Sequence, residues 1–526
     1  MKPLEYLTLN QLMEQTAHIY PQHPAMTFRD KSWTYLEMET LTNQLAAGLL
    51  ASGVHKGDHI GILSENSPNA ILSFLAVIKA GCIACMLNTS LKTGELLELL
   101  ELSDIQYLLM GHHYKDKQFY PQCQELCKFY PLKQIFDIGQ KSSSPYPSFQ
   151  TLLDRGKEYT EPYDSVRTQL TSQDDCLILY TSGTTGNQAK AVLSTHFHLV
   201  NGGIQKAHSL SLTEQDILCC ALQLFHIFCI DVNIMAAIAV GACLAIPDDM
   251  HSANILNTLE SEKCTILSCV PFTYRTILSK EDFAQRDLSH LRTGIIGGAY
   301  CSPDNFKKIE QGFGFTLLPG LGQTEAIAGI SVGYPDDSLE IRSSTVGHLV
   351  NHSEGKIIDL ETGAALPPKT SGEICVRSPL LMKGYYKRPD LTETIIDSEG
   401  WLHTGDIGYL TEDGLLHYIG RKKELINRGG EKIIPAEIEA IIAQIPEISR
   451  YKVIGLPDPM YGEEVCACIV PKTPGSITAD EILAFLKSHL APFKVPRKIV
   501  FLEQFPMNAS GKIQIVQLTK MAQAIA

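Results

Sequence analysis

The sequence of 526 residues lacks an apolar run that is both long and uniform enough to cross a membrane. The run 71–87 contains Lys79 and a glycine, and the run 232–246 ends at Pro247. The second run also falls short of the roughly 20 apolar residues that a spanning helix needs. Both runs predict a core helix followed by a core strand, and we expect no membrane span.

Positive charge is not in excess either. The net charge is −14, which disfavours a duplex nucleic-acid partner. Hydrophobic residues make up 44% and charged residues 19%, as in a globular protein. The length allows more than one domain, each with its own core.

Residues 1–6, Met-Lys-Pro-Leu-Glu-Tyr, lead directly into a mixed polar segment, so we expect no secretory leader. We therefore expect reduced cysteines and a cytoplasmic protein. The pairs Cys82/Cys85 and Cys123/Cys127 could bind a structural zinc only if they converged. Cys82 and Cys85 lie within an apolar helix–glycine–strand pattern, which favours small-residue packing over zinc.

The most informative stretch is 180–192, Tyr-Thr-Ser-Gly-Thr-Thr-Gly-Asn-Gln-Ala-Lys-Ala-Val, between strand patterns at 176–180 and 190–194. Its glycines permit a tight turn, and its hydroxyls and Lys190 supply donors and charge for a polyphosphate. The spacing is not that of a Walker A loop, whose Gly-Lys-Ser/Thr opens a helix. A flexible turn rich in serine, threonine and glycine is the alternative.

This stretch resembles the phosphate loop of the adenylate-forming (AMP-binding) superfamily, which includes acyl-CoA synthetases, other acid–thiol ligases and luciferases. The family pattern is Thr-Ser-Gly-Thr-Thr-Gly-x-Pro-Lys-Gly-Val, whereas this chain carries one extra residue and lacks the proline and the last glycine. The resemblance implies that Thr184 is catalytic and binds Mg²⁺. It implies ATP binding by Thr181, Ser182, Gly183, Thr184, Thr185, Gly186 and Lys190.

The segment 221–229, Ala-Leu-Gln-Leu-Phe-His-Ile-Phe-Cys, resembles the family's Pro-Leu-Phe-His-x-Phe-Gly. The resemblance places His226 beside the reacting carboxylate, as a catalytic residue, and Phe228 and Cys229 in the acyl pocket. A lone histidine between apolar residues is otherwise usually a packed core residue. Peptide-synthetase domains often carry an aspartate in this segment, and its absence argues against an amino-acid substrate.

The segment 295–300, Ile-Ile-Gly-Gly-Ala-Tyr, predicts a strand that ends in two glycines. Such an end allows a flat ligand to approach, although a tight turn is the simpler reading. It resembles the family's Gly-Gly-Ala-Pro, which lines the adenine and acyl sites. The resemblance therefore implies nucleotide contacts by Gly298, Ala299 and Tyr300, and an acyl-pocket contact by Tyr300.

The segment 317–325 ends in Thr-Glu, where a hydroxyl can contact phosphate and a carboxylate can hold Mg²⁺. Alone, this pair usually begins a helix. Here it resembles the family's Tyr-Gly-x-Thr-Glu, with leucine in place of the tyrosine that stacks on adenine. The resemblance implies that Glu325 is catalytic and a metal ligand, and it implies ATP or AMP contacts by Gly320, Leu321, Gly322, Gln323 and Thr324.

Four later motifs match the family in order. Thr-Gly-Asp at 404–406 implies ribose binding by Asp406, and Gly-Arg-Lys-Lys-Glu at 420–424 implies a nucleotide contact by Arg421 and a hinge at Lys423. Gly429 and Gly430 would face coenzyme A. Near the end, Ser-Gly-Lys-Ile implies that Lys512 binds ATP and orients the carboxylate as a catalytic residue.

Alternating helix and strand patterns predict an α/β fold. We expect a large N-terminal AMP-binding domain, residues 1–420, of mixed and parallel sheets packed with helices. A small, mobile C-terminal α+β domain, residues 421–526, would be joined to it by the hinge. The segment 111–171 is polar and predicts irregular structure.

The resemblance covers nearly the whole chain and implies an ATP-dependent acid–thiol ligase. It would adenylate an apolar fatty or aryl acid with ATP and Mg²⁺ and pass the acyl group to coenzyme A. One alternative is transfer to a separate acyl carrier protein. Another is a degenerate, nucleotide-binding regulatory protein. It is favoured by the departures from the family pattern: Gln188 and Ala189 in the phosphate loop, Leu321 in place of the tyrosine, and Ile515 where the family often has an arginine.

Overall fold

The computed structural model describes residues 3–139, 144–182, 189–507 and 513–525. They group into two compact units. The first comprises Met1–Glu354 and Arg377–Leu402, and the second comprises Gly355–Val376 and His403–Ala526. A four-stranded sheet that precedes residue 421 thus groups with the C-terminal segment. The boundary at 420 and the hinge at Lys423 stay predictions.

A mixed seven-stranded sheet forms the first half of the first unit within the described residues. Strands β9, β4, β3, β5 and β8 run parallel, and β10 and β20 add antiparallel strands at one edge. Its order is β20 (Gly384–Tyr385), β10 (Ala189–Thr195), β9 (Asp175–Ser182), β4 (Ile83–Met86), β3 (His59–Leu63), β5 (Tyr107–Met110) and β8 (Gln134–Asp137).

A nine-stranded sheet forms the other half of this unit in the same described ranges. It is parallel in the middle and antiparallel at both ends. Its order is β17 (His348–Leu349), β16 (Ala326–Val332), β15 (Thr316–Gln323), β14 (Thr293–Ile296), β13 (Ile266–Leu267), β11 (Ile217–Cys219), β12 (Cys243–Ala245), β1 (Pro24–Phe28) and β2 (Lys31–Thr34).

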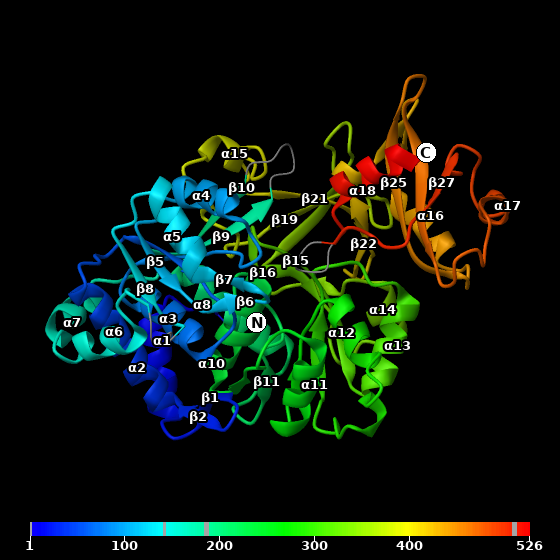
Figure 1. Cartoon of the computed structure of the whole chain (residues 1–526). Helices are drawn as coiled ribbons and strands as arrows, with labels where there is room; N and C mark the ends of the chain where they lie inside the picture. Colours follow the sequence, from blue (N-terminus) through cyan, green and yellow to red (C-terminus); the bar gives the residue numbers. More distant parts are fainter. Residues whose placement is uncertain (1–2, 140–143, 183–188, 508–512, 526) are drawn as a thin grey trace. The chain divides into compact units, whose positions relative to one another are not determined.

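Helices cover these sheets. α2 packs against α3, α6 and α7, while α11, α12 and α13 lie together over the second sheet (Figure 1). The helices are α1 (Leu9–Ile19), α2 (Tyr35–Ala51), α3 (Pro68–Lys79), α4 (Thr93–Leu102), α5 (Phe119–Phe129), α6 (Phe149–Lys157), α7 (Thr160–Thr168), α8 (His196–Ser209), α9 (Ile227–Cys229), α10 (Ala236–Val240), α11 (Ser252–Ser261), α12 (Pro271–Leu278), α13 (Pro303–Phe313), α14 (Leu339–Ser344) and α15 (Pro389–Glu393), with the π-helix η1 (Ile230–Met235), the 3₁₀ turn η2 (Phe283–Gln285) and the small hairpin β6 (His113–Tyr114)–β7 (Lys117–Gln118).

Over its described residues, the second unit holds a four-stranded sheet, in which β21 and β22 pair antiparallel, and a five-stranded sheet. The first is β18 (Glu354–Ile358), β19 (Gly372–Arg377), β21 (Leu402–Leu410) and β22 (Leu416–Arg421), followed by the 3₁₀ turn η3 (Lys422–Glu424). The second is β24 (Glu431–Ile433), β23 (Ile426–Arg428), β26 (Gly462–Pro471), β25 (Ile448–Asp458) and β27 (Lys498–Phe501), with helices α16 (Pro435–Ile442), α17 (Ala479–Lys487) and α18 (Ile515–Ile525).

The predicted α/β class and the large and small domains are confirmed, but one local expectation was wrong. The segment 111–171 is not irregular, since it contains α5, β8, α6 and α7. In α5, Phe119, Cys123 and Leu126 recur at helical spacing and are buried. Elsewhere, Pro271 opens helix α12, because proline fits the first helical position.

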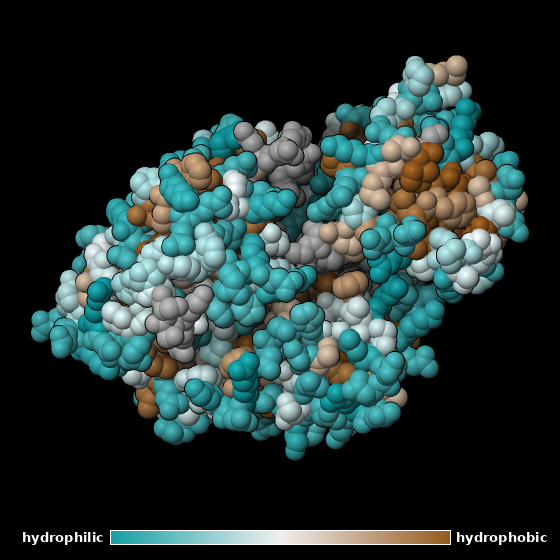
Figure 2. All heavy atoms as spheres, in the orientation of Figure 1, coloured by the Kyte–Doolittle hydropathy of each residue, from teal (hydrophilic) through white to brown (hydrophobic). Residues whose placement is uncertain are grey.

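In the described ranges, no helix is both long and apolar enough to span a bilayer. All fifteen cysteines carry free thiols, and thirteen of them are buried. Figure 2 shows hydrophobic residues gathering around α18 of the second unit, where Val516 is 73% and Ile525 is 59% exposed.

Candidate active site

The strand–loop–strand arrangement at the predicted phosphate loop is confirmed on its strands. β9 and β10 pair antiparallel, with Thr181 opposite Lys190. The loop residues Gly183, Thr184, Thr185 and Gly186 lie outside the described residues. The Lys190 ammonium lies 4.9 Å from the centroid of the Tyr385 ring, which places a cation over an aromatic face.

Thr324 and Glu325 form the turn between β15 and β16 rather than the start of a helix. The Glu325 carbonyl accepts a 2.9 Å hydrogen bond from the backbone N–H of Met382. Its side-chain Oε1 accepts a 2.7 Å hydrogen bond from the Tyr385 hydroxyl. Glu325 is therefore fixed at both its backbone and its carboxylate.

Tyr385 is the residue that sequence reasoning missed. It is buried on β20, which pairs with β10 at Val192, and it lies between Glu325 and Lys190. Burial, and next the Glu325 charge, hold the pKa of the Tyr385 hydroxyl well above its usual value, so that it stays a donor. A tyrosine directly after a glycine, in a strand two residues long, is a weak sequence signal.

The donor set near Glu325 fits Mg²⁺. Tyr385 engages one oxygen of the carboxylate, and the other oxygen is a hard ligand of the kind Mg²⁺ prefers. Among the described residues, no group of three or more acidic, histidine or cysteine side chains converges as a closed metal cage. A single carboxylate suits Mg²⁺, which usually binds one or two carboxylates together with substrate phosphates.

The glycines after β14 and those in β15 adjoin the predicted acyl pocket. A Cβ on Gly297 would lie 3.0 Å from the Gly320 carbonyl oxygen and 3.7 Å from Phe228 Cζ. Gly298 has φ of +76°, a conformation that favours glycine. The structure therefore brings Gly297, Gly320 and Phe228 close together.

The other residues of these segments vary in exposure. Tyr300 is 55% exposed, so its ring does not fill a closed pocket in this structure, and its predicted acyl contact stays a prediction. Gly298 and Ala299 are also exposed. Gly320, Leu321, Gly322 and Gln323 all belong to β15, which leads directly to Glu325.

His226 and Cys229 flank the short helix α9. The His226 ring lies 4.5 Å from the Phe225 ring, centroid to centroid, and its backbone N–H bonds to the Gln223 carbonyl. The Cys229 thiol is fully buried in the main core, 3.7 Å from the Cys220 sulfur. The roles of both residues at the acid stay predictions.

Asp406 and Arg421 pair directly in the second unit. They face each other across β21 and β22, and Arg421 Nε lies 2.7 Å from Asp406 Oδ1. Asp406 is fully buried, and its backbone N–H bonds to the Thr404 hydroxyl. The carboxylate predicted to bind ribose is thus held by the arginine predicted to contact the same nucleotide.

A second ion pair supports this hairpin. The Glu373 carboxylate accepts hydrogen bonds from the Gly405 N–H at 3.2 Å and from the Lys422 ammonium at 2.7 Å. Gly405 has φ of +68°. Glu373 lies in β19, and a lone carboxylate in a strand gives no local sequence signal for a distant lysine partner.

The remaining predicted residues of the second unit lie on turns. Lys423 is exposed in η3. Gly429 and Gly430, with φ of +60° and +95°, form the turn between β23 and β24, and a Cβ on Gly429 would lie 3.1 Å from the Tyr461 ring. Lys512 lies outside the described residues.

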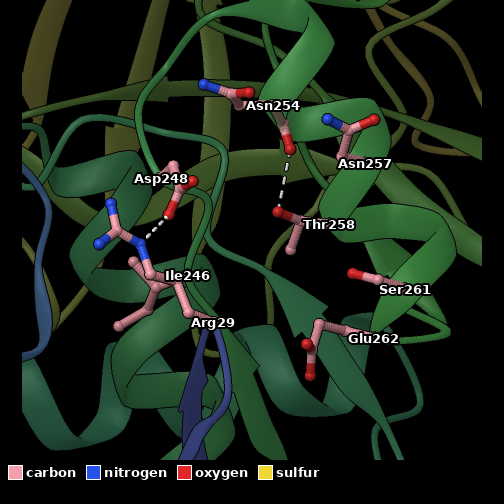
Figure 3. A pocket seen from close by; sticks show the side chains of 8 residues that line it. All are labelled: Arg29, Ile246, Asp248, Asn254, Asn257, Thr258, Ser261 and Glu262. Carbon is pink, nitrogen blue, oxygen red and sulfur yellow. Dashed lines mark hydrogen bonds and ion pairs between the residues drawn. The ribbon is translucent and has the colours of Figure 1, made fainter.

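A separate polar pocket of about 140 Å³ lies elsewhere in the first unit (Figure 3). The Arg29–Asp248 ion pair, at 2.6 Å, stands on one side, and Asn254, Asn257 and Thr258 of α11 stand on the other. None of the predicted site residues lines it, so we do not assign it to the reaction.

Comparison with known proteins places this geometry in context. The family model described as AMP-binding enzyme matches residues 13–386, and the model described as AMP-binding enzyme C-terminal domain matches residues 437–512. The chain is 35% identical to YngI of Bacillus subtilis, over 98% of this chain and 97% of that protein.

Two further relatives carry informative names. The chain is 30% identical to the human mitochondrial medium-chain acyl-CoA ligase ACSF2, over 98% of this chain and 88% of that protein. Its fold matches the crystal structure of the anthranilate CoA ligase AuaEII in complex with anthranoyl-AMP, with a TM-score of 0.87 and 26% identity, over 99% of this chain and 98% of the other.

Proposed function

Because the chain belongs to the AMP-binding enzyme family, and within it to the AMP-forming acyl-CoA synthetases, we propose that its substrate is a largely apolar carboxylic acid, fatty or aryl. The observation that carries this proposal is the apolar wall beside the site. The Phe228 ring lies close to Gly297, since a Cβ on Gly297 would be in van der Waals contact with Phe228 Cζ at 3.7 Å, and Gly297 in turn lies beside the Gly320 carbonyl oxygen, 3.0 Å from that Cβ. Such a wall accommodates a chain or ring by packing.

Relatives support both classes of acid. ACSF2 is named as a medium-chain acyl-CoA ligase, and AuaEII as an anthranilate CoA ligase. One substrate is apolar and flexible, and the other is a flat ring. The Tyr300 ring, which is 55% exposed, offers an aromatic surface that would suit either kind of acid.

In the proposed first step, an oxygen of the acid attacks the α-phosphorus of ATP, giving acyl-AMP and pyrophosphate. Lys190, the hydroxyls of the phosphate loop and Lys512 would offset the charge that gathers on phosphate. Mg²⁺, held by Glu325 and Thr184, would supply further charge neutralisation when bound. Tyr385 would keep Glu325 in place, and Asp406 with Arg421 would hold the ribose.

In the proposed second step, the thiol of coenzyme A attacks the carbonyl of acyl-AMP and AMP leaves. The C-terminal domain would turn about Lys423, withdraw Lys512 and present Gly429 and Gly430 to the thiol. Such a movement is a gating device of the kind that lids provide. Transfer to a carrier protein and a regulatory role without turnover stay as alternatives.

The test is to identify the products that form with ATP, Mg²⁺ and a panel of straight-chain and aromatic acids, with and without coenzyme A. Acyl-AMP and pyrophosphate without coenzyme A, and acyl-CoA and AMP with it, are the expected result. Adenylation that leaves coenzyme A unchanged would favour a carrier protein. Turnover confined to amino acids or short diacids would overturn the proposed substrate class.

A further inference from the structure

Two oppositely charged side chains are buried in the first unit and take no part in the proposed chemistry. Lys206 is on α8 and is 6% exposed, and Asp231 is on the π-helix η1 and is 2% exposed. Asp231 Oδ1 has no hydrogen-bond partner in the described part of the chain. No hydrogen bond or ion pair of the described residues involves the Lys206 ammonium.

Both groups lie against the hairpin that carries the predicted site. A Cβ on Gly329 of β16 would lie 2.7 Å from Lys206 Nζ and 3.5 Å from the Leu321 carbonyl oxygen. A Cβ on Gly202 would lie 2.4 Å from Asp231 Oδ1 and 3.4 Å from Ile327 Cγ2. Two glycines thus make room for two charged side chains beside β15 and β16.

The helix that carries Asp231 adjoins the short helix α9, which carries the predicted acyl-pocket residue Phe228. η1 follows directly on α9, so Asp231 comes three positions after Phe228, and α8 packs against both η1 and β16. The π-helical turns are themselves uncommon and often occur at functional sites. Asp231 therefore lies on the element that continues the one carrying Phe228, and Lys206 lies on a helix packed against that element.

Leaving two such charges unpaired is costly in a protein interior. Burial raises the pKa of Asp231 to about 7 and lowers the pKa of Lys206, and each group partly counters the shift of the other. Apolar residues of similar size would pack at this place without any cost of desolvation. The unmet hydrogen bonds point to a ligand group that supplies them.

We propose that Lys206 and Asp231 form a polar subsite of the acyl pocket that binds a hydroxyl group carried by the acid. A hydroxyl accepts a hydrogen bond from the ammonium and donates one to the carboxylate, so one group satisfies both residues. A second carboxylate on the acid would be attracted by Lys206 but repelled by Asp231. This inference rests on the proposed function and narrows its substrate to an otherwise apolar acid with a hydroxyl.

The test compares acids that differ by a single hydroxyl. Medium-length straight-chain acids are paired with their terminally hydroxylated counterparts, and benzoate is paired with its ring-hydroxylated forms. For at least one pair we expect kcat/KM for acyl-CoA formation to be about tenfold or more higher with the hydroxyl, because a site built around a hydroxyl discriminates against the analogue without it. Lys206→Met and Asp231→Asn should each reduce that ratio toward one.

A matched control is Lys79→Met. Lys79 is also a fully buried helical lysine, but it forms a 2.7 Å ion pair with Glu39. We expect this variant to lower the melting temperature and to keep the hydroxyl preference. Loss of the preference in Lys79→Met as well would show a general packing effect and overturn the inference.

Binding is measured separately, as the shift in melting temperature that each acid of a pair produces without ATP. This readout separates the two proposals. If the chain turned over no acid, the proposed function would be wrong. A larger shift in melting temperature with the hydroxylated acid, lost in Lys206→Met, would still support the subsite. Equal shifts and equal kcat/KM for every pair would overturn the subsite while leaving acyl-CoA synthesis intact.

Discussion

The Tyr385 hydroxyl donates a 2.7 Å hydrogen bond to Glu325 Oε1, while the Lys190 ammonium lies 4.9 Å from the centre of the same ring. One tyrosine thus joins the strand after the phosphate loop to the turn that carries the predicted metal ligand. Glu325 and Lys190 are far apart in the sequence, and the short strand β20 is the element that unites them.

This relationship predicts a positioning role for Tyr385. Tyr385→Phe removes the hydrogen bond but keeps the ring beneath Lys190, so we expect kcat for pyrophosphate release to fall about tenfold and the Mg²⁺ concentration for half-maximal rate to rise. The control is Tyr386→Phe, since the neighbouring Tyr386 hydroxyl donates to Asp104 instead, also at 2.7 Å. Equal Mg²⁺ dependence in wild type and Tyr385→Phe would contradict the role.

A second prediction concerns Asp406 and Arg421. Asp406→Asn keeps the size of the side chain but removes the charge that pairs with Arg421 at 2.7 Å. We expect the Kd for AMP to rise about tenfold or more, as for loss of a charged hydrogen bond. Isothermal titration of the full chain measures it, with Lys452→Met as the control.

Lys452 forms ion pairs with Glu424 at 3.0 Å and with Glu439 at 3.2 Å in the same unit, and it does not pair with Asp406. Its loss should reduce stability and leave the affinity for AMP unchanged. A similar loss of AMP affinity in both variants would show that Asp406 acts through stability alone.

A third prediction concerns pH. Burial lowers the pKa of His196 from 6.5 to about 4, and its Nδ1 accepts a hydrogen bond from the Leu9 N–H. The unfolded chain therefore takes up a proton below pH 6.5 that the folded chain refuses until about pH 4. Above pH 6.5 this group costs the folded state nothing. As the pH falls from 6.5 to about 4, His196 lowers the free energy of unfolding by about 3 kcal/mol.

His196→Asn supplies a similar hydrogen-bond acceptor that does not titrate. In this variant the free energy of unfolding should therefore fall by about 3 kcal/mol less than in wild type between pH 6.5 and about pH 4. Both tryptophans, Trp33 and Trp401, belong to the first unit, so their fluorescence during urea unfolding reports on the unit that holds His196. His55→Asn is the control, because the His55 side chain is 80% exposed. An unchanged acid slope in His196→Asn would contradict the prediction.

A fourth prediction concerns the size of the acid. Phe228 forms the wall next to Gly297, and Phe228→Ala removes the ring. We expect kcat/KM to fall for the best acid and to rise for a bulkier one, so that their ratio changes about tenfold or more. Phe129→Ala, which changes an exposed phenylalanine on α5, should leave the ratio unchanged. A fall by the same factor for all acids in Phe228→Ala would contradict a pocket role.

The fold could be predicted from the sequence wherever apolar periodicity was strong. The strands at 176–180 and 190–194 are present in the structure within one or two residues. The helices between 111 and 171 were missed, because α6 and α7 are short and mostly polar and their buried positions are few. In this segment the polar composition indicated irregular structure, and the weak helical spacing of the apolar residues was not enough to predict helices.

The site divides in the same way. Motifs that are contiguous in sequence identified the two strands around the phosphate loop and the Thr324–Glu325 segment between strands. Tyr385, Glu373, Lys206 and Asp231 could not be found, because their significance lies in contacts between distant segments. A buried lysine inside a helical pattern, as at position 206, is the sort of local inconsistency that sequence alone can flag but not explain.

The most direct test of the central claim is acid-dependent pyrophosphate release from ATP, measured with and without coenzyme A, in the native chain and in Lys512→Ala. We expect release that requires an acid of one class, yields acyl-CoA when coenzyme A is present, and falls by orders of magnitude in the variant. Binding of ATP without release for any acid, or release that is indifferent to both the acid and Lys512, would contradict it.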